Sequence, residues 1–555
     1  MSTRGARRTS DAPGARVSFP RLTTAAQAAA RDHAAITGGT DSFALMQQAA
    51  STAAAAIIRH AGNTLAHGVA VFAGRGNNGG DAYLVAAQLA RYGVTVRLHA
   101  AGVPTTPDAQ RAARLAAPFL TFGEITGHER VVVDGILGTG HQGALRDQAA
   151  AACARVQLLR DAGARVMALD IPSGVNASTG EVADGAVTAD CTIAFGTLKR
   201  AHLFGRDRMG LLVLTDIGLG PYAKCPGDED DGAWRWAARE QLGALLPPLA
   251  WDTHKGRRGR VGLVGGDAGM AGAIVLATRA ALAAGAGLAH AIVHEASVPA
   301  LQTLVPQAIT HRWPPLLATR KHDVVDPSGD APRYDAVAVG PGLGRTRESQ
   351  QLVERLLQVH RGIALVLDAD ALWLAADAAQ ALGTDAASLI RHWTRDARAV
   401  VCTPHPGEFA RLLGRALPDS WDDRAALLAE FSVRSNTTVL LKGTPTLVAH
   451  QREPLTAVPY GTPLLATGGS GDCLTGVIAT FLAQGVMARD AAVLGAAVHG
   501  LAAERATWDA LGTVRGLSLD DWRAQLPPVF ADLAATPRPD PGELARLAPL
   551  SVMRA

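Results

Sequence analysis

The sequence predicts an α/β protein with two successive domains, each built around a parallel β-sheet. Twice along the 555 residues, an apolar strand leads into a glycine-rich loop, a helical pattern and a second apolar strand, which is the pattern of a βαβ unit. The first unit begins at Gly68 (GVAVFAGRGNNGGDAYLVAAQLARYGVTVRLHA) and the second at His254 (HKGRRGRVGLVGGDAGMAGAIVLATRAALAAGAGLAHAIV). Between them, residues 221–240 mix proline, glycine and an acidic cluster, as linkers do. A chain of this length is also too long for one hydrophobic core.

The composition excludes several classes of protein. A net charge of +3 is too small to indicate binding to nucleic acid or to an anionic membrane, and no apolar run reaches the length of a membrane span. The five cysteines are scattered and form no CxxC pair, which indicates a reducing compartment. We therefore expect a cytoplasmic protein, and we expect it to form a homo-oligomer.

The first domain is expected to follow a disordered tail over residues 1–21, which is polar and rich in arginine. An alanine-rich pattern predicts helix from Leu22 to Ile58, and five apolar strands follow it: Val69–Phe72, Val94–Leu98, Val131–Val133, Val166–Leu169 and Leu211–Leu214. Asp134 and Asp170 each come directly after one of these strands. Because ligands bind beyond the carboxyl ends of parallel strands, we expect both carboxylates and two glycine-rich loops to meet in one crevice.

The motif GRGNNGGDAY departs from a dinucleotide-binding fingerprint, since Asn77 and Asn78 stand where small residues would let a pyrophosphate approach. Their amides offer hydrogen bonds and oxygen ligands instead. Asn78, Asp134 and Ser173 together supply one carboxylate among neutral oxygens, which favours a monovalent cation over Mg²⁺ or Ca²⁺. The alternative is that these residues only form tight turns, for which Asn, Asp, Ser and Gly are the usual residues.

The second domain repeats the alternation of strands and helices. Strands at Ala336–Val339, Ala364–Leu367 and Val400–Cys402 lead into the loops GPGLG, DADAL and TPHPGE, and TVLLKGTPTLVA predicts a hairpin.

The stretch ATGGSGDCLTG, from Ala466 to Gly476, predicts a glycine-rich loop that runs into a buried helix ending at Gly485. Free N–H groups and the positive end of the helix dipole favour a phosphate there. Asp472 is an unusual neighbour for a phosphate, and it predicts a base that takes a proton from a hydroxyl reacting at phosphorus. The alternative is that Asp472 is a helix N-cap in a tight turn.

Other residues of this half have two interpretations each. Lys442 could place a charge on a phosphate or form a salt bridge. His405 could bind substrate, or it could cap the next helix together with Glu408. Asp368 and Asp370 could hold Mg²⁺ through water or cap a helix, and we favour the cap for Asp370.

Taken in order, these motifs resemble the family of bifunctional NAD(P)H-hydrate repair enzymes, which fuse an NAD(P)HX epimerase to an ADP- or ATP-dependent NAD(P)HX dehydratase. The match runs through GRGNNGGD, DGILGTG and DIPSG, and then through HKGRRGRV, GPGLG, HPGEF, LLKGTPT and GGSGDCLTG. The resemblance implies a Rossmann-like epimerase domain over residues 22–222 and a ribokinase-like, ADP-dependent dehydratase domain over residues 240–530. It leaves a linker over 223–239 and a C-terminal tail over 531–555.

The resemblance also implies the site residues. The positions expected to contact NADHX or NADPHX in the first domain are Asn77, Asn78, Gly79, Gly80, Asp81, Gly138, Thr139, Gly140, His141, Gln142, Gly143, Ala144 and Asp170, with K⁺ held by Asn78, Asp134 and Ser173. In the second domain the substrate positions are Ala273, Gly342, His405 and Asp472. The site for ADP or ATP with Mg²⁺ comprises Lys442, Gly443, Thr444, Pro445, Thr446 and Gly471. The chain departs from the family pattern at Ala82, often glycine, at Ser470, commonly threonine, and at Pro445, usually a small residue.

The implied reaction repairs NADH or NADPH that has gained water and carries a hydroxyl at C6 of the nicotinamide ring. Asp472 would take the proton of this hydroxyl, whose oxygen attacks the terminal phosphate of the nucleotide. The dehydratase is expected to act on the S epimer, and Asp170 is the expected acid/base residue that interconverts R and S. The sequence leaves ADP or ATP open, and its bacterial character favours ADP.

Two other functions are also compatible with parts of the sequence. GGSGD alone is also compatible with a ribokinase-like small-molecule kinase that carries a fused ligand-binding domain. A nucleotide-sensing or protein-binding module without turnover is the other alternative, and it leaves Asp472 unexplained.

Overall fold

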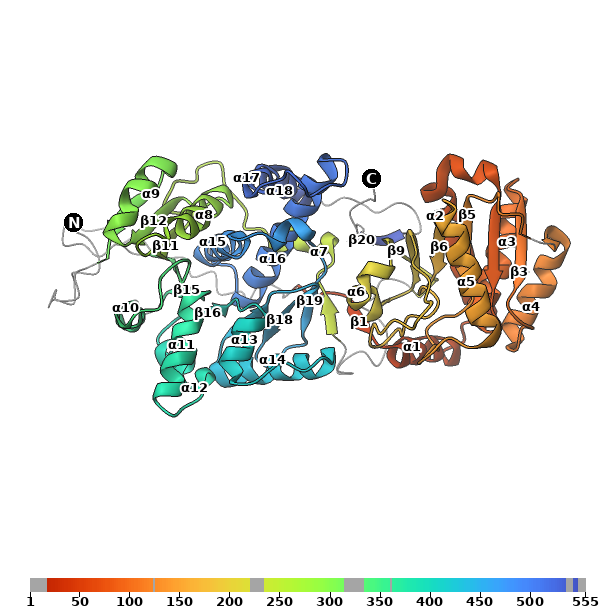
Figure 1. The fold of residues 1–555 in the computed structure, drawn as a ribbon, viewed down its shortest axis with the longest axis horizontal. Helices are drawn as coiled ribbons and strands as arrows, with labels where there is room; N and C mark the ends of the chain where they lie inside the picture. Colours follow the sequence, from red (N-terminus) through yellow and green to blue (C-terminus); the bar gives the residue numbers. More distant parts are fainter. Residues whose placement is uncertain are drawn as a thin grey trace, which may run out of the picture.

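The computed structural model describes residues 17–122, 125–219, 234–313, 334–359, 362–535 and 543–547. The first sixteen residues of the expected tail, most of the expected linker and Cys225 lie outside these ranges. The two expected domains form the two halves of an elongated molecule, with the N-terminal domain at the right of Figure 1 and the C-terminal domain at the left. The α/β fold class predicted from the sequence is confirmed.

The N-terminal domain is a sheet covered by helices on both faces. Its strand order in the described residues is β20-β9-β7-β6-β5-β2-β3-β4, and every pair is parallel except β20 with β9. The strands are β2 (Val69–Ala73), β3 (Val96–Ala100), β4 (Thr121–Phe122), β5 (Val131–Gly135), β6 (Arg165–Leu169), β7 (Cys191–Phe195), β9 (Leu211–Thr215) and β20 (Glu543–Leu547). All five strands predicted from the sequence are present, within two residues at each end. Strand β7 and the two-residue strand β4 were missed.

Two apolar cores lie on opposite faces of this sheet. Val69, Val71 and Ala73 of β2 pack with helices α2 (Ser42–Ala61) and α3 (Asn77–Arg91), whereas Ala70 and Phe72 pack with α5 (Asp147–Asp161). Alternate residues of a strand face opposite sides, and apolar residues at both sets of positions therefore require helices on both faces. Helix α1 (Ala25–Thr37) and helix α4 (Pro107–Ala116) complete this domain around the site described below.

The C-terminal domain contains the larger sheet, with the order β13-β12-β11-β14-β15-β16-β17-β18-β19-β10-β1-β8. Its main strands are β11 (Arg260–Gly265), β12 (Leu288–Val293), β13 (Ile309–Arg312), β14 (Ala336–Val339), β15 (Ala364–Leu367), β16 (Ala399–Cys402), β17 (Thr438–Leu441), β18 (Thr446–His450) and β19 (Thr456–Val458). The strands from β13 to β17 pair in parallel, and β17 and β18 form the predicted antiparallel hairpin.

Helices again cover both faces of the larger sheet. One face carries α8 (Ala271–Ala283), α15 (Ser470–Ala483), α16 (Ala488–Asp509), α17 (Leu519–Ala524) and α18 (Leu526–Ala534). The other carries α10 (Arg347–Val359), α11 (Asp370–Ala381), α12 (Ala386–Trp393), α13 (Pro406–Leu413) and α14 (Trp421–Ser435). Helix α15 is the buried helix predicted after the GGSGD loop, and it ends two residues before Gly485.

Short strands from distant parts of the chain join the two domains. Strand β1 (Arg21–Thr23) pairs with β8 (Leu198–Lys199) of the N-terminal half and with β10 (Trp234–Trp236), and β10 pairs with β19. In return, β20 comes from the C-terminal end of the chain and pairs with β9. Figure 1 shows β20, in blue, beside β9 in the N-terminal half.

These strands correct the expected tails and linker. Arg21 lies in a strand and Phe19 is buried, so the described part of the expected N-terminal tail, from residue 17, is folded. Residues 234–236 of the expected linker and 543–547 of the expected C-terminal tail are also strands. Their hydrogen-bonding partners are far away in sequence, so local composition gave no sign of them. Trp234 and Trp236 of β10 are both buried, so this part of the expected linker packs onto the folded chain.

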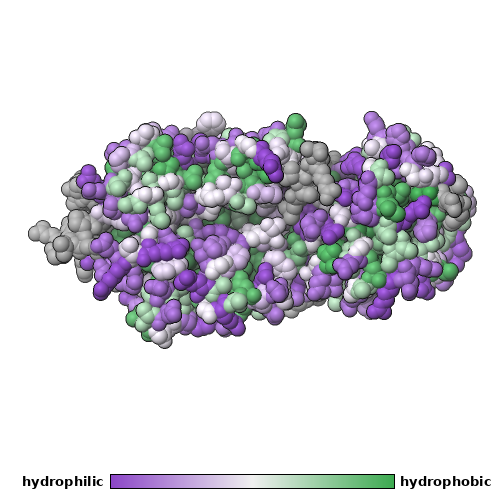
Figure 2. All heavy atoms as spheres, in the orientation of Figure 1, coloured by the Kyte–Doolittle hydropathy of each residue, from purple (hydrophilic) through white to green (hydrophobic). Residues whose placement is uncertain are grey.

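Side chains reinforce the junction between the domains. Phe204 stacks on Trp421 with ring centroids 4.5 Å apart, and Arg200 pairs with Asp422 while lying 4.2 Å from the ring centroid of Trp234. On the face shown in Figure 2, hydrophilic and hydrophobic residues are interspersed over both halves. No helix in the described ranges is long and apolar enough to cross a membrane.

Candidate active sites

The first candidate site is a cavity of about 1270 Å³ at the carboxyl ends of the N-terminal strands. Of the residues predicted to contact the hydrated nucleotide, those that line it are Asn77, Asn78, Asp81, Gly138, Thr139, Gly140, His141, Gln142, Ala144 and Asp170. Gly143, Gly79 and Gly80 do not line it. A side chain at Gly79 would meet the backbone of Gly74, and one at Gly80 would meet Met46. These two glycines therefore allow close packing of α3 within the protein.

The predicted cation ligands come together at one edge of this cavity. Ser173 donates from Oγ to Asp134 Oδ1 at 2.6 Å and from its backbone N–H to Asp134 Oδ2 at 2.8 Å. Asn78 Nδ2 donates to the carbonyls of Leu137 (2.7 Å) and Leu169 (3.2 Å). Since the N–H of Leu137 donates to Ser173 Oγ at 2.9 Å, the three predicted ligands surround the same loop.

One atom of this group indicates what it could hold. Asn78 Oδ1 is buried and has no hydrogen-bond partner in the described structure, which is costly unless a ligand satisfies it. Asp134 is fully buried, and burial raises its pKa while the hydrogen bonds from Ser173 and Ile136 oppose that rise. A carbonyl oxygen without a partner beside a hydroxyl and one buried carboxylate fits a weakly charged cation such as K⁺.

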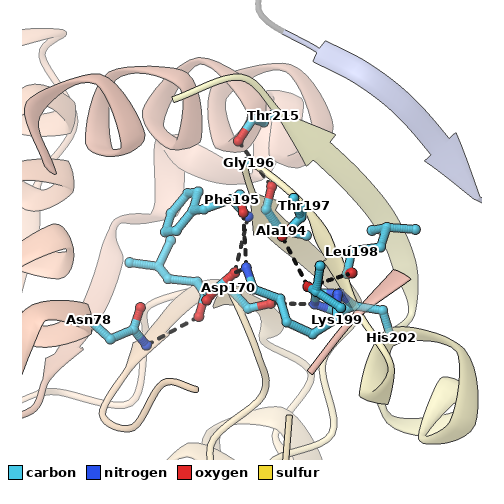
Figure 3. A network of polar contacts seen from close by, with 12 residues as sticks. Asn78, Asp170, Ala194, Phe195, Gly196, Thr197, Leu198, Lys199, His202 and Thr215 are labelled. Atoms are coloured by element: carbon cyan, nitrogen blue, oxygen red, sulfur yellow. Dashed lines mark hydrogen bonds and ion pairs between the residues drawn. The ribbon is translucent and has the colours of Figure 1, made fainter. Parts of the chain in front are cut away.

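Asp170 is held from three sides (Figure 3). Its Oδ1 accepts from Lys199 Nζ at 2.6 Å and from the N–H of Phe195 at 3.1 Å. Its carbonyl oxygen lies 2.7 Å from His202 Nε2. Because His202 Nδ1 accepts from the N–H of Lys199, Nε2 carries the proton and donates to that carbonyl. Burial lowers the pKa of His202 to about 4, so the ring is neutral. The backbone of Asp170 has a φ of +60°, a conformation that these contacts hold in place.

The sequence did not identify two charged residues of this cavity. Asp32 of α1 and Lys199 of β8 both line it, and the Lys199 side chain is only 4% exposed. Asp32 lies in an alanine-rich helix without a motif. The scarcity of lysine in this arginine-rich chain was the one signal for Lys199. Ala82, a departure from the family pattern, is fully buried, and its methyl group occupies space left by the missing side chain of Gly135.

The second candidate site lies at the N-terminus of α15. The helix begins at Ser470 and its N-cap is Gly469, with φ +92° and no side-chain cap. The N-cap alternative for Asp472 is therefore wrong, since Asp472 lies in the first turn of the helix. Its carboxylate accepts no hydrogen bond among the described residues. Burial and the charge of Asp368 raise the pKa of Asp472 to about 7, although Lys442 opposes the rise.

A buried ion pair lies beside Asp472. Lys442 Nζ donates to Asp368 Oδ1 at 2.6 Å, and Thr475 Oγ1 donates to Asp368 Oδ2 at 2.6 Å. Burial alone would lower the pKa of Lys442, but Asp368 and Glu408 raise it above its ordinary value. The salt bridge expected as the alternative role of Lys442 is present. The ammonium also lies over the first turn of α15, because a side-chain carbon at Gly471 would be 3.1 Å from Lys442 Nζ.

The other predicted residues of this domain lie in loops near the same strand ends. Asp370 does not cap a helix as expected. Its oxygens accept from Gly344 N at 2.9 Å and from Arg345 Nε at 2.7 Å, so it fixes the GPGLG loop. His405 is the N-cap of α13, and its Nδ1 accepts from the N–H groups of Gly407 and Glu408.

Gly342 lies against Ala273 at the start of α8, since a side chain there would be 3.1 Å from the Ala273 methyl group. The remaining predicted nucleotide positions, Gly443, Thr444, Pro445 and Thr446, form the turn of the β17–β18 hairpin and the start of β18.

A larger cavity, of about 1550 Å³, lies between the domains. It is lined by residues such as Arg208, Arg239 and Glu504, and by none of the predicted site residues. Size alone therefore does not identify the site in this molecule. The motif residues converge at the strand ends of the two candidate sites and not in this cavity.

Comparison with known proteins gives the same division of the chain into two domains. The NAD(P)H-hydrate dehydratase family matches residues 261–521, and the family of YjeF-related protein N-termini matches residues 42–201. A bifunctional NAD(P)H-hydrate repair enzyme of Vibrio cholerae is 33% identical over 77% of this chain and 81% of its own length, and one of Pyrobaculum aerophilum is 34% identical over 84% and 90%. A crystal structure of an ADP/ATP-dependent NAD(P)H-hydrate dehydratase from Bacillus subtilis is 28% identical, covers 54% of this chain and 99% of its own, and has a TM-score of 0.45.

Proposed function

We propose that this chain, which belongs to the family of bifunctional NAD(P)H-hydrate repair enzymes, converts hydrated NADH and NADPH back to the reduced cofactors. The N-terminal Rossmann-like domain interconverts the R and S epimers. The C-terminal ribokinase-like domain removes water from the S epimer at the expense of ADP or ATP, which releases AMP or ADP and phosphate. The observation that carries the proposal is the Asp472 carboxylate, placed without a hydrogen-bond donor in the first turn of α15.

Dehydration begins with a proton transfer to Asp472. A pKa of about 7 lets this carboxylate be ionised and still accept a proton near neutral pH. The C6 oxygen of the substrate, relieved of its proton, attacks the terminal phosphate of the nucleotide. The N–H groups at the start of α15 and the ammonium of Lys442 face the phosphate and offset its charge. Inorganic phosphate then leaves C6 with the electron pair of the C6–O bond as the ring nitrogen donates its electron pair, and loss of a proton from C5 to solvent restores the dihydronicotinamide.

Mg²⁺ would reach this site with the nucleotide. Both oxygens of Asp368 already accept hydrogen bonds, from Lys442 and from Thr475. Asp368 would therefore contact Mg²⁺ through a water molecule and not directly. Such an ion, held mainly by phosphates, supplies charge neutralisation at the transferred group. The predicted nucleotide residues Lys442 to Thr446 and Gly471 border the place where these phosphates would lie.

In the N-terminal cavity the R epimer must break and re-form a bond at C6. Asp170, fixed by Lys199, Phe195 and His202, is the acid/base residue of this step. K⁺ bound by Asn78, Asp134 and Ser173 would orient the loop that carries Gly138 to Ala144. A cytoplasmic location and a homo-oligomeric state are parts of the same proposal.

The test uses the full chain and hydrated NADH supplied as mixed epimers, with ADP or ATP. We expect the absorbance of the reduced cofactor to recover completely, because the R epimer is converted to S. Recovery limited to the S fraction would contradict the epimerase activity, and no recovery with either nucleotide would contradict the dehydratase activity. Product analysis separates this function from a kinase, since a kinase leaves a stable phosphorylated product whereas dehydration releases free phosphate.

A further inference from the structure

The N-terminal cavity brings three carboxylates close to one ammonium. Asp32 from α1, Asp81 from α3 and Asp170 from the end of β6 line it together with Lys199, which pairs with Asp170. Arg31 lies beside Asp32, and Arg75, Arg146, Asp108 and Asp147 also line the cavity. Repulsion between neighbouring carboxylates, together with burial, favours a proton on the most buried of them, Asp81.

The contacts of Asp81 and Asp170 differ in the same direction. Asp170 receives two donors on one oxygen, the Lys199 ammonium at 2.6 Å and the Phe195 N–H at 3.1 Å (Figure 3). Both are hydrogen-bond donors to a carboxylate oxygen. Asp81 is only 9% exposed and accepts no hydrogen bond from any described residue. A buried carboxyl group without donors is more stable in its neutral form.

We propose that Asp81 and Asp170 act as an acid–base pair on the C6 hydroxyl of the substrate, with Asp81 as the acid and Asp170 as the base. Lys199 is the residue that keeps the protonation states of the two carboxyl groups different. This inference rests on the proposed epimerase function. It adds a protonation state and a catalytic role to Asp81, and it gives Lys199 a positioning role.

The chemistry balances without a further reactant. Asp81 gives its proton to the C6 hydroxyl oxygen, the C6–O bond breaks with its electron pair on oxygen, and water leaves. The lone pair of ring N1 forms a double bond to C6. A second water then attacks C6 from the opposite face and loses a proton to the Asp170 carboxylate. The epimer is inverted, one oxygen has been exchanged with solvent, and solvent returns the proton from Asp170 to Asp81.

The electrostatics of the cavity agree with this assignment. Burial raises the pKa of Asp81 well above its ordinary value, and the nearby charges of Asp170 and Asp32 raise it further, whereas Lys199 opposes them. Burial also raises the pKa of Asp32. Two carboxyl groups whose surroundings favour opposite protonation states are the usual arrangement of an acid and a base. Epimerisation is therefore lost as the pH rises and Asp81 gives up its proton to solvent.

The experiment measures interconversion of the R and S epimers by the full chain, without nucleotide, against the rate in buffer alone. If the wild-type chain does not accelerate it, the proposed epimerase function fails. If it does, Asp81→Asn should slow it about 10²–10⁴-fold, whereas Asp161→Asn, at an exposed aspartate of α5, should not. Dehydration of the S epimer by Asp81→Asn should stay within twofold of wild type, because that site lies in the other domain.

Two measurements do not depend on the folding of a variant. In ¹⁸O-labelled water the wild-type enzyme should incorporate one ¹⁸O per epimerisation. Its rate should also fall on the alkaline side of the pH profile. Epimerisation without ¹⁸O uptake, a profile without an alkaline decline, or a folded Asp81→Asn variant with the wild-type rate would each overturn the assignment. Lys199→Met should move the alkaline limb to higher pH, since Asp81 would lose the cation that opposes its protonation, whereas a purely structural lysine would leave the limb in place.

Discussion

Replacing Asp472 by asparagine should remove dehydratase activity and at the same time stabilise the folded chain. The carboxylate is partly buried, it lies near the negative charges of Asp368, Asp370 and Glu408, and only Lys442 opposes them. The folded protein therefore disfavours the charged form that catalysis requires. Asparagine has a similar shape and no charge, so it relieves this cost and cannot accept the proton.

The size of the effect follows from the pKa. The pKa of Asp472 is about 7 in the folded chain against an ordinary 3.8, a difference of about 3. At about 1.4 kcal/mol for each pKa unit, the ionised carboxylate costs about 4 kcal/mol at most. Water reaches part of this side chain and screens it, so we expect about half, roughly 2 kcal/mol. Because the folded pKa is raised, the cost is absent below pH 4, grows as the pH rises, and is complete above pH 7.

The assay compares thermal unfolding of wild type and Asp472→Asn at pH 8 and pH 5, without nucleotide. At pH 8 the Tm should rise by roughly 4–8 °C if the domain unfolds as a unit, and at pH 5 by less than half of that. Phosphate release should fall about 10²–10⁴-fold. Asp377→Asn, at an exposed position of α11, is the control and should change neither. An equal Tm gain at both pH values would refute the argument from buried charge. A normal rate of phosphate release would refute the role of Asp472 as the base.

Four further outcomes follow from the same structure. Dehydration by the wild-type chain should increase as the pH rises through about 7, because only the ionised form of Asp472 accepts the proton; a rate that is flat between pH 6 and 8 would count against it. Asn78→Ala should remove the dependence of epimerisation on K⁺ as against Na⁺, measured by titration with each ion, because it deletes the buried oxygen without a partner. Lys442→Met should destabilise the chain by about 3–5 kcal/mol in denaturant titrations, since Asp368 is left buried without its cation. Ending the chain at residue 535 should lower the Tm of the N-terminal domain, because β9 loses its partner β20; an unchanged melting curve would show that β20 adds nothing.

The sequence predicted the parts of the fold that have local causes. Long apolar strands followed by glycine loops predicted the two parallel sheets and placed Asp134 and Asp170 at strand ends, where the structure has them. Strand β7 was missed although it lies centrally, between β6 and β9. Its five residues, CTIAF, follow a turn-rich segment over residues 172–190, and a cysteine and a threonine at its start weaken the apolar run.

The charged partners of the catalytic residues could not be predicted, because nothing local marks them. Lys199 reaches Asp170 across 29 positions, and Lys442 reaches Asp368 across 74. Asp370 illustrates the same limit, since its place before a helix suggested a cap and its actual role is to hold Gly344 and Arg345. Which charged residues pair depends on which strand ends lie side by side, and this depends on the order of the strands in the sheet.

The strand that carries Lys199 connects the two domains structurally. This strand, β8, does not belong to the sheet of the domain that carries Asp170, the aspartate we propose as catalytic. β8 is instead the last strand of the larger sheet, and it is reached from β19 through β10 and β1. Residues 21–23, backed by residues 234–236, thus hold the strand of the lysine that pairs with Asp170, and β19, the next strand along, belongs to the dehydratase domain. An epimerase domain without residues 21–23 keeps all of its own sequence motifs, but it loses the β1 hydrogen bonds that keep β8 in register. β1 thus completes the scaffold of the first site, and β10 and β19 connect that scaffold to the second domain.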